Sequence, residues 1–330
     1  MWNAVEWTKT FRAASAARDG DSLHGLRRQV WSHTVEIVRA SVYEVGRARV
    51  DLDAASAEAL RQRTVLYPHT NDLVVAPAQR GQYRTLVSVH NADFLEIARA
   101  IATPECVPAV LNMANRRNPG GGVHDGAGAQ EENLFRRSNA FCSLYQFVDY
   151  ASDYSVPRNE GASYPIPRES GAIYSPGVTV FRSAETTGYA LLGHPYRVNV
   201  LTVPAINEPA LIERQRQLWL TDQMARATLL KIRAMFRVAA RHEQPDVVLS
   251  AFGCGAFRNP PQHMAELFRE VLAEREFAGV FRRVAFAIID DHNAFHRASP
   301  EGNCVPFERA GPYARLKQRC TDWSAIAAVC

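Results

Sequence analysis

The sequence lacks the features that mark a membrane or secreted protein. No run of about 18 or more apolar residues, the length that a membrane-spanning helix needs, occurs in the chain. The first residues contain neither the basic segment nor the apolar segment of a secretory signal. We therefore expect a soluble, cytoplasmic protein that does not contact membranes.

Blocks of like charge and paired cysteines are also missing. The net charge of +4 is small for 330 residues, and lysine occurs only at Lys9, Lys231 and Lys317. Without a basic arm, we expect no direct nucleic-acid binding. The six cysteines form no Cys-x-x-Cys pair and have no neighbouring histidines at zinc-ligand spacing. This pattern predicts neither a disulfide framework nor a metal site.

The beginning of the chain is predicted to be helical. Its first 60 or so residues contain no proline and few glycines, and the apolar residues Leu26, Val30, Ile37 and Val38 recur at helical spacing. We expect residues 1–75 to form a helical extension that packs on the core.

From about residue 83 onward, short β-rich segments alternate with helical patterns. One helix carries an apolar stripe after Thr221, its expected N-cap, and another is expected to begin after Asn259 as N-cap. A third helix is expected over residues 131–147, and a surface loop over residues 149–172. The strand candidates are residues 84–89, 109–112, 178–181, 198–203, 247–250 and 284–289. This alternation predicts an α/β sheet with helices on both faces.

Three consecutive glycines follow the strand candidate at residues 109–112. Because Gly120, Gly121 and Gly122 have no Cβ atoms, a ligand can approach their backbone closely. The carboxyl end of a strand is also where α/β sheets bind ligands. After seven residues the helix expected at residues 131–147 begins beside Gln130, Glu131 and Glu132.

A second glycine-containing loop, residues 251–261, follows the strand candidate at residues 247–250. It leads into a helix N-terminus, where backbone N–H groups and the helix dipole hold phosphate oxygens. It lacks the lysine and the terminal serine or threonine of a P-loop. A nucleotide diphosphate held without magnesium fits this loop better than ATP turnover.

Together these segments resemble the microbial poly(ADP-ribose) glycohydrolases, whose hallmark is three glycines followed some seven residues later by Gln-Glu-Glu on a macrodomain scaffold. The resemblance covers about residues 80–295 and includes, in the family's order, residues 110–112, 118–119, 174–176, 180–182, 202–205 and 253–257. It implies a macrodomain-like three-layer α/β/α fold with a mixed sheet. We expect this domain to span residues 76–300 and to be followed by a C-terminal tail at residues 301–330.

The resemblance also implies an activity and a site. The expected reaction hydrolyses ribose–ribose O-glycosidic bonds in poly(ADP-ribose) or on ADP-ribosylated proteins and releases ADP-ribose, without a cofactor or metal. This would reverse ADP-ribosylation in the DNA damage response. Glu132 would be catalytic, and Glu131 would bind the ribose. The implied ADP-ribose-binding residues are Asn118, Gly120, Gly121, Gly122, Gln130, Gly253, Cys254, Gly255, Ala256 and Phe257. The candidates for the adenine pocket are Asp93, Asn293 and Phe295.

One carboxyl group is expected to act first as an acid and then as a base. Neighbouring residues on a helix point about 100° apart, so Glu131 and Glu132 are not expected to flank a bond as a glycosidase pair. The helix dipole favours the charged form of a first-turn glutamate, whereas an acid needs its proton. We therefore expect the bound substrate, through burial and its negative diphosphate, to favour protonated Glu132.

Three alternatives stay open from the sequence. A reader module of the same fold binds ADP-ribose without cutting it, but it has no need of a carboxylate at the scissile ribose. A hydrolase of mono-ADP-ribosylated protein or nucleic acid is the second alternative. A thiol or zinc enzyme built on Cys254 is the third.

Three further polar residues are expected to have no catalytic role. His124 is interpreted as an exposed loop histidine. The Arg136-Arg137 pair is interpreted as a helix surface.

Overall fold

Two compact units make up the chain in the computed structural model, which describes residues 2–291 and 293–310. The first unit contains the residues up to 67 together with residues 112–167 and 173–202. The second contains residues 68–111, residues 168–172 and the residues from 203 on. Cys320, Cys330 and residues 311–330 of the predicted tail lie outside the described residues. The division into residues 1–75, 76–300 and 301–330 stays a prediction.

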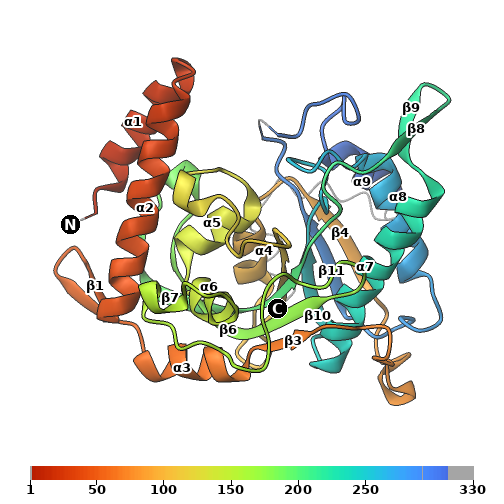
Figure 1. Ribbon diagram of the computed structural model, residues 1–330, viewed down its shortest axis with the longest axis horizontal. Helices are drawn as coiled ribbons and strands as arrows, with labels where there is room; N and C mark the ends of the chain where they lie inside the picture. The colour runs from red at the N-terminus through yellow and green to blue at the C-terminus, as the bar shows by residue number, and fades with distance from the viewer. Residues whose placement is uncertain (1, 292, 311–330) are drawn as a thin grey trace. The chain divides into compact units, whose positions relative to one another are not determined.

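The first unit begins with two helices that pack side by side, α1 (Ala4–Ala16) and α2 (Gly20–Ala40) (Figure 1). Asn3 and Asp19 cap them, because their side-chain oxygens accept hydrogen bonds from backbone amides of the first turns. Val30 is fully buried against Trp7 and Tyr189. The predicted helical start is therefore confirmed for these two elements.

A hairpin interrupts the predicted helical extension. Strands β1 (Val42–Val45) and β2 (Ala48–Asp51) pair antiparallel and are followed by helix α3 (Ala54–Arg63). The turn uses Gly46 at φ +62°, a conformation that glycine adopts without strain. Tyr43 packs on Phe181, and this burial favours the strand pair over a continuous helix. The prediction of a purely helical segment was wrong at this point.

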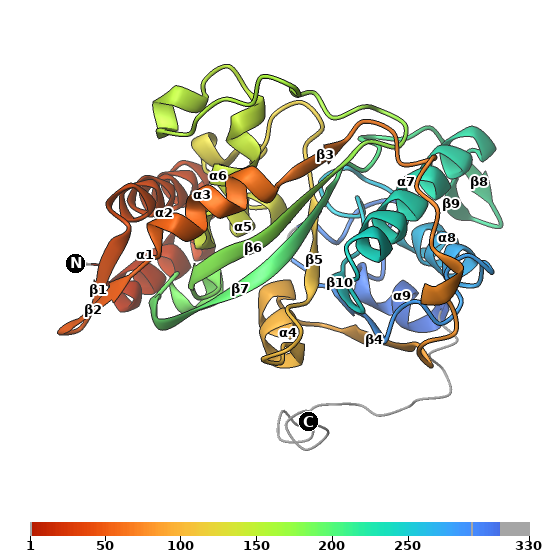
Figure 2. The same ribbon diagram turned by 90° about the horizontal axis from the view of Figure 1, so that it is seen from below.

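Besides the β1–β2 hairpin, the first unit contains strands β3 (Val65–Tyr67), β6 (Ala172–Arg182) and β7 (Leu191–Val203), hydrogen-bonded in that order. Figure 2 shows β6 and β7 as two long strands side by side, and they pair antiparallel. Their register shifts between Ser175 and Val178, where Gly177 has a φ of +77°. The loop predicted at residues 149–172 forms only one short 3-10 turn, η4 (Ala151–Tyr154).

The single helix predicted at residues 131–147 is broken into α5 (Gln130–Arg137), α6 (Ala140–Leu144) and η3 (Tyr145–Phe147). The break lies at Ser138, whose extended backbone forms a β-bridge with Val180. The surface prediction for the arginine pair was also wrong. Arg136 and Arg137 are buried, and their guanidinium groups donate to neighbouring carbonyl and side-chain oxygens.

Parallel pairing dominates the second unit. Its strand order is β5, β10, β11, β4, with residues 109–111 of β5 in this unit. The bounds are β4 (Leu86–His90), β5 (Ala109–Met113), β10 (Asp246–Leu249) and β11 (Arg283–Ala287). Buried apolar runs in β5 and β10 are typical of parallel strands with both faces covered. All six predicted strands are thus present.

Four helices lie in the part of the second unit that the structure describes. They are α4 (Phe94–Ile101), α7 (Asp222–Arg241), α8 (Pro261–Leu272) and α9 (Cys304–Ala310). Thr221 caps α7 as predicted, since its side chain accepts a hydrogen bond from Met224 N. The shorter elements are the 3-10 turn η1 (Pro77–Gln79) and the hairpin of β8 (Leu211–Arg214) and β9 (Gln217–Leu220). Parallel and antiparallel pairs with intervening helices confirm the predicted α/β class.

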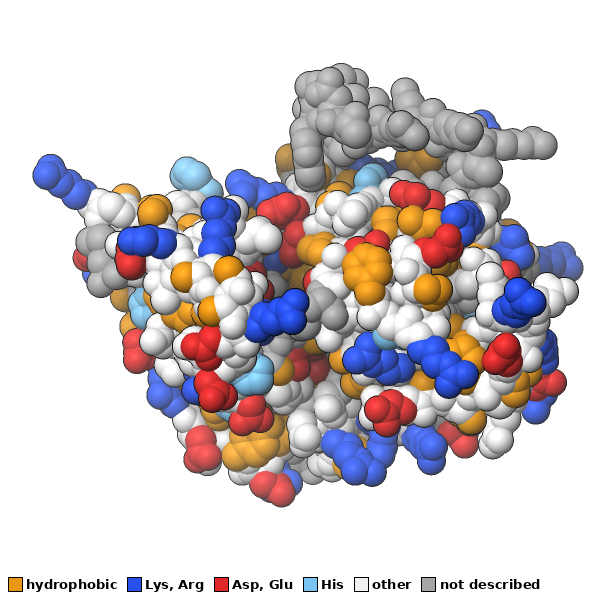
Figure 3. Space-filling model, turned by 90° about the horizontal axis from the view of Figure 1, so that it is seen from above, with side chains coloured by type: hydrophobic (Ala, Val, Ile, Leu, Met, Phe, Trp, Pro, Cys, Tyr) orange, Lys and Arg blue, Asp and Glu red, His pale blue; other side chains and the backbone are white. Residues whose placement is uncertain are grey.

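The surface carries charges of both signs. On the face shown in Figure 3, arginine and lysine side chains are interspersed with aspartate and glutamate. Among the described residues, no helix combines the length and the apolar character that crossing a membrane requires.

Candidate active site

The loop after β5 is a series of tight turns. In the first turn, Gly121 N donates to Asn118 O at 2.9 Å. Pro119 in the second position and Gly120 at φ +81° in the third are typical of a type II turn. The next turn closes from Val123 N to Gly120 O at 3.0 Å and leads into η2 (Val123–Asp125). The backbone of the triple glycine is therefore fixed by its own hydrogen bonds.

The glycines admit side chains of α5. A Cβ on Gly121, which has a φ of +56°, would overlap Glu132 Oε1 and lie 3.4 Å from Glu131 Oε2. A Cβ on Gly120 would lie 2.6 Å from the ring of Phe135. The sequence predicted that these glycines make room for a ligand. The structure adds that the glutamates themselves need that room.

Glu131 is buried and ties three segments together. Its Oε1 accepts hydrogen bonds from Gly120 N at 3.1 Å and from Asn112 Nδ2 at 3.2 Å. Its Oε2 accepts from Asn115 N at 2.6 Å. The end of β5, the triple glycine and the start of α5 are thus held by one carboxyl group. Glu131 contacts the loop that Glu132 also contacts, although helical spacing alone predicted that the two side chains point apart.

The same environment makes it hard for both glutamates to be charged. Burial first, and the negative charge of Glu132 second, raise the pKa of Glu131 to about 8, while its three hydrogen-bond donors lower it. A carboxyl group in this range holds a proton at neutral pH. The pair therefore retains a proton where an exposed glutamate would have lost it.

Glu132 has one anchored oxygen and one unpaired oxygen. The residue is 7% exposed, and its Oε1 accepts from Gly122 N at 2.9 Å. Its Oε2 is buried and has no hydrogen-bond partner within the described residues. Leaving a buried polar atom unpaired costs stability, so such an atom in a folded protein calls for a functional explanation. Oε2 is the oxygen of Glu132 that has no protein partner among the described residues.

Three further polar residues organise the loop. Gln130 Oε1 accepts from Met113 N at 2.9 Å and so joins the start of α5 to the end of β5. Asn115 Oδ1 accepts from Arg117 N and Asn118 N, as in an Asx turn, while Asn118 itself is exposed. Asn112 and Asn115 had no predicted role. The turn chemistry of Asn115 was visible in the sequence, but the hydrogen bonds of Asn112 and Asn115 to Glu131 were not.

In the second unit, the loop after β10 presents free backbone amides. Cys254 N donates to Ala251 O, but the amides of Gly255, Ala256 and Phe257 donate no hydrogen bond within the described residues. Successive unpaired amides before a helix are suited to an anion. This geometry agrees with the phosphate-binding role predicted for the loop.

The side chains of Asn259 and His296 hold this loop in place by donating to backbone carbonyls. Asn259 Nδ2 donates to the carbonyls of Ile206 at 2.8 Å, Gly253 at 3.1 Å and Phe257 at 3.3 Å. His296 Nε2 donates to Cys254 O at 2.7 Å. The prediction that Asn259 caps α8 was wrong, because its amide is used by the loop and Pro260 occupies the cap position. His296 was not predicted at all, since no spacing rule links it to a carbonyl 42 residues away.

Cys254 is not suited to nucleophilic chemistry. It is buried, and burial raises the pKa of its thiol well above the usual range. The thiolate that a nucleophile or metal ligand needs is therefore disfavoured. Within residues 2–291 and 293–310, no group of three or more His, Cys, Asp or Glu side chains is placed to hold a metal ion. Burial of the thiol therefore argues against the alternative of a thiol or zinc enzyme built on Cys254.

The adenine candidates differ in exposure. Asp93 is 8% exposed and caps α4, where its Oδ1 accepts from Leu95 N and Glu96 N. Phe295 is 60% exposed, and Asn293 is half-buried. An exposed aromatic ring is available for stacking on a base. The assignment of all three to the adenine pocket stays a prediction.

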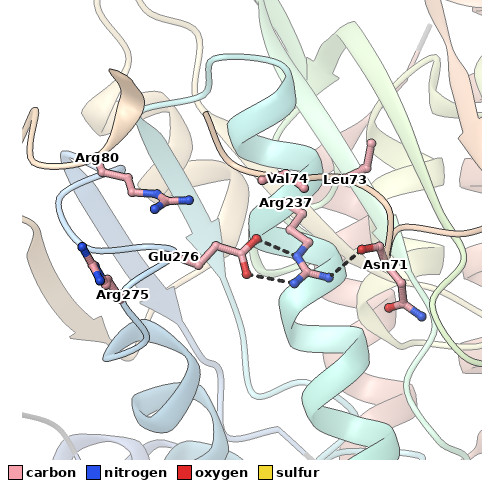
Figure 4. Close-up of a pocket in the computed structure, with 7 residues that line it drawn as sticks. All are labelled: Asn71, Leu73, Val74, Arg80, Arg237, Arg275 and Glu276. Atoms are coloured by element: carbon pink, nitrogen blue, oxygen red, sulfur yellow. Dashed lines mark hydrogen bonds and ion pairs between the residues drawn. The ribbon is translucent and has the colours of Figure 1, made fainter. Parts of the chain in front are cut away.

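A hollow of about 420 Å³ in the second unit contains none of the predicted site residues. Figure 4 shows its lining, in which Glu276 forms an ion pair with Arg237 at 2.7 Å. The full lining is Asn71, Leu73, Val74, Arg80, Arg237, Arg275 and Glu276. Its only carboxylate is neutralised, so the hollow has no acid or base for the expected hydrolysis.

Comparison with known proteins places these features in a family. Residues 32–183 match the family model described as the catalytic domain of microbial-type PARG. The poly(ADP-ribose) glycohydrolase of Thermomonospora curvata bound to the inhibitor ADP-HPD is 31% identical, with a TM-score of 0.67 over 86% of this chain and 99% of that chain. The enzyme of Deinococcus radiodurans in complex with ADP-ribose is 33% identical, with a TM-score of 0.61 over 79% and 98%. No curated protein matches the chain. The structural matches confirm the predicted macrodomain-like fold.

Proposed function

Because the chain belongs to the microbial-type poly(ADP-ribose) glycohydrolases, we propose that it hydrolyses ribose–ribose O-glycosidic bonds in poly(ADP-ribose) and releases ADP-ribose. The observation that carries this proposal is the carboxyl group of Glu132. One of its oxygens is fixed by Gly122 N, and the other is buried without a partner in the described residues. A protein that only binds ADP-ribose gains nothing from such an atom, whereas a hydrolase needs one.

Glu132 acts as the acid and then as the base. In the first step its proton passes to the leaving ribose oxygen while the bond from that oxygen to the anomeric carbon breaks. In the second step the resulting carboxylate takes a proton from water, whose oxygen bonds to the anomeric carbon. Glu131 does not serve as a second flanking carboxylate, because both of its oxygens already accept protein hydrogen bonds.

The raised pKa of Glu131 keeps a proton in the glutamate pair at neutral pH. Two neighbouring carboxylates in a buried site avoid double charge by keeping one proton between them. We propose that the pair supplies the proton of the first step.

We also propose which residues contact the diphosphate and the adenine of the substrate. The free amides of Gly255, Ala256 and Phe257 are suited to the diphosphate, and the exposed ring of Phe295 to the adenine. Contacts of Glu131, Gln130 and Asn118 with ribose, a role in the DNA damage response and a cytoplasmic location stay predictions.

The decisive experiment compares the wild-type protein with Glu132→Gln on two substrates. Automodified polymer and mono-ADP-ribosylated protein are offered separately, and released ADP-ribose is measured. We expect release from polymer by the wild type, and a loss of about a thousandfold or more in kcat for Glu132→Gln, the size of an essential acid–base contribution. ADP-ribose binding by the variant should persist.

Each other outcome points elsewhere. Unimpaired release by Glu132→Gln would refute the assigned role. Binding without release by either protein would support a reader module. Release from the mono-modified protein alone would support the mono-ADP-ribosyl hydrolase.

A further inference from the structure

One face of α2 supports the second half of the catalytic loop. A Cβ on Gly126 would overlap the backbone carbonyl of His24, and a Cβ on Gly128 would lie 2.5 Å from the guanidinium of Arg27. Trp31 lies one turn further on, and the three α2 residues stand at i, i+3 and i+7, which is a single helix face. The loop between the triple glycine and the glutamate pair therefore rests directly on α2.

His124 provides the polar contacts on this face. Its Nδ1 lies 3.3 Å from Trp31 Nε1 and 3.1 Å from the hydroxyl of Tyr154, and its Nε2 lies 3.0 Å from the hydroxyl of Tyr145. An indole N–H can only donate, so Nδ1 accepts and carries no proton. Nε2 then carries the proton and donates to Tyr145. The exposed position predicted for His124 is confirmed, but its ring is bonded through both nitrogens.

We propose that His124 is a positioning residue for the hydrolysis, whose neutral ring fastens the catalytic loop to α2 and to the segment at residues 145–154. This inference rests on the proposed function. Protonation of Nδ1 would set its N–H against the N–H of Trp31, so the contact would become a repulsion between two donors. The loop would then lose its attachment at His124. This position is two residues after Gly122, whose amide donates to the carboxyl group of Glu132.

The surroundings favour the neutral ring at neutral pH. Partial burial of the ring lowers the pKa of His124, and the nearby charge of Asp125 opposes this effect. Arg28 of α2 donates to the carbonyl of Asp125 at 3.3 Å. The other titratable or charged groups of α2 are Asp21, His24, Arg27, His33, Glu36 and Arg39. Those on the other packed elements are Glu131, Glu132, Arg136 and Arg137 of α5, Tyr145 of η3, and Asp153 and Tyr154 of η4. A proton is therefore taken up only as the pH falls toward the acidic range.

The test measures kcat and KM on polymer between about pH 5 and pH 8. His124→Asn keeps an acceptor for Trp31 Nε1, and this acceptor cannot take up a proton. Trp31→Phe keeps an aromatic side chain at position 31 but removes the N–H donor. Both should lower kcat at neutral pH by about fivefold, the factor expected for one weakened hydrogen bond, with little change in KM. Both should also lose less activity in acid than the wild type. The matched control is His194→Asn, an exposed histidine of β7 that should keep the wild-type profile.

Two results would overturn the proposal. One is a wild-type acid profile in both His124→Asn and Trp31→Phe. The other is a rise in KM at unchanged kcat, which would indicate contact with substrate. If the wild type does not hydrolyse polymer, the proposed function fails, and the inference is tested separately by NMR of the imidazole nitrogens. There the proposal requires the Nε2–H tautomer of His124, and an Nδ1–H tautomer contradicts it.

Discussion

At the scale of single residues, two adjacent glutamates are distinguished by their donors. Among the described residues, three donors face Glu131 and one, Gly122 N, faces Glu132. From the sequence, the acidity of Glu132 had to come from bound substrate. The structure adds a proton held within the protein, because burial and the charge of Glu132 raise the pKa of Glu131.

This retained proton makes stability depend on pH. The pKa of Glu131 is raised from its ordinary value of 4.5 to about 8, so between these values the folded state holds a proton that the unfolded state has lost. The stabilisation is complete below pH 4.5 and disappears as the pH rises through 8. The free energy of unfolding should therefore fall by at least about 1 kcal/mol more in the wild type than in Glu131→Gln.

Urea unfolding at about pH 5.5 and about pH 8.5 measures this difference. Glu36→Gln, which replaces an exposed glutamate of α2, is the control and should follow the wild type. If the free energy of unfolding changed equally between the two pH values in the wild type and in Glu131→Gln, the raised pKa of Glu131 would be contradicted.

Gly121 offers a second residue-scale prediction. Gly121→Ala combines a positive φ with a Cβ that overlaps the carboxyl group of Glu132. We expect kcat on polymer to fall by about a hundredfold, the cost of misplacing a catalytic group by about 1 Å. Gly46→Ala has a similar φ of +62° but open space, so it should lose about 1 kcal/mol of stability and no activity. Equal activities of the two variants would show that backbone strain alone matters.

At the scale of elements, the loop after β10 depends on one buried amide. Asn259→Ala removes hydrogen bonds to two loop carbonyls and to the carbonyl of Ile206, and it should weaken ADP-ribose binding by about tenfold or more. The chemical step should be spared, because Glu132 belongs to the other unit. Calorimetric titration with ADP-ribose and single-turnover rates check both statements. Asn71→Ala, an exposed position of the same unit, is the control. A slower single-turnover rate at saturating substrate would contradict this division of roles.

The sequence predicted the helices and strands whose formation depends on residues close together in the chain. The six strands and the helix capped by Thr221 follow from side-chain period and capping chemistry, which act within a few residues. Elements shaped by distant partners were not predictable. The helix break at Ser138 depends on Val180, and the burial of Arg136 depends on Tyr189. The same holds for the candidate site, where the motif predicted Glu132 but not the asparagines that orient its neighbour.

At the scale of the whole molecule, the charge pattern does not favour binding of a generic polyanion. Its net charge is small, and both signs of charge are mixed on the face in Figure 3. A protein that binds through many phosphate contacts loses about 10³-fold or more in affinity between about 50 and 200 mM salt. Here we expect less than about a tenfold change in KM for polymer over that range. Single-stranded DNA should not compete, whereas ADP-ribose should.

The support that α2 gives to the catalytic loop has a practical consequence for dissecting the protein. The family match begins at residue 32, directly after Trp31. A recombinant fragment trimmed to that boundary would retain both glutamates and both glycine loops, yet it would discard His24, Arg27 and Trp31, the helix face on which the loop rests. A family match marks the part of a chain that can be aligned with its relatives. In this enzyme the match begins within α2, after the residues that support the loop, so a fragment that starts there is not expected to catalyse.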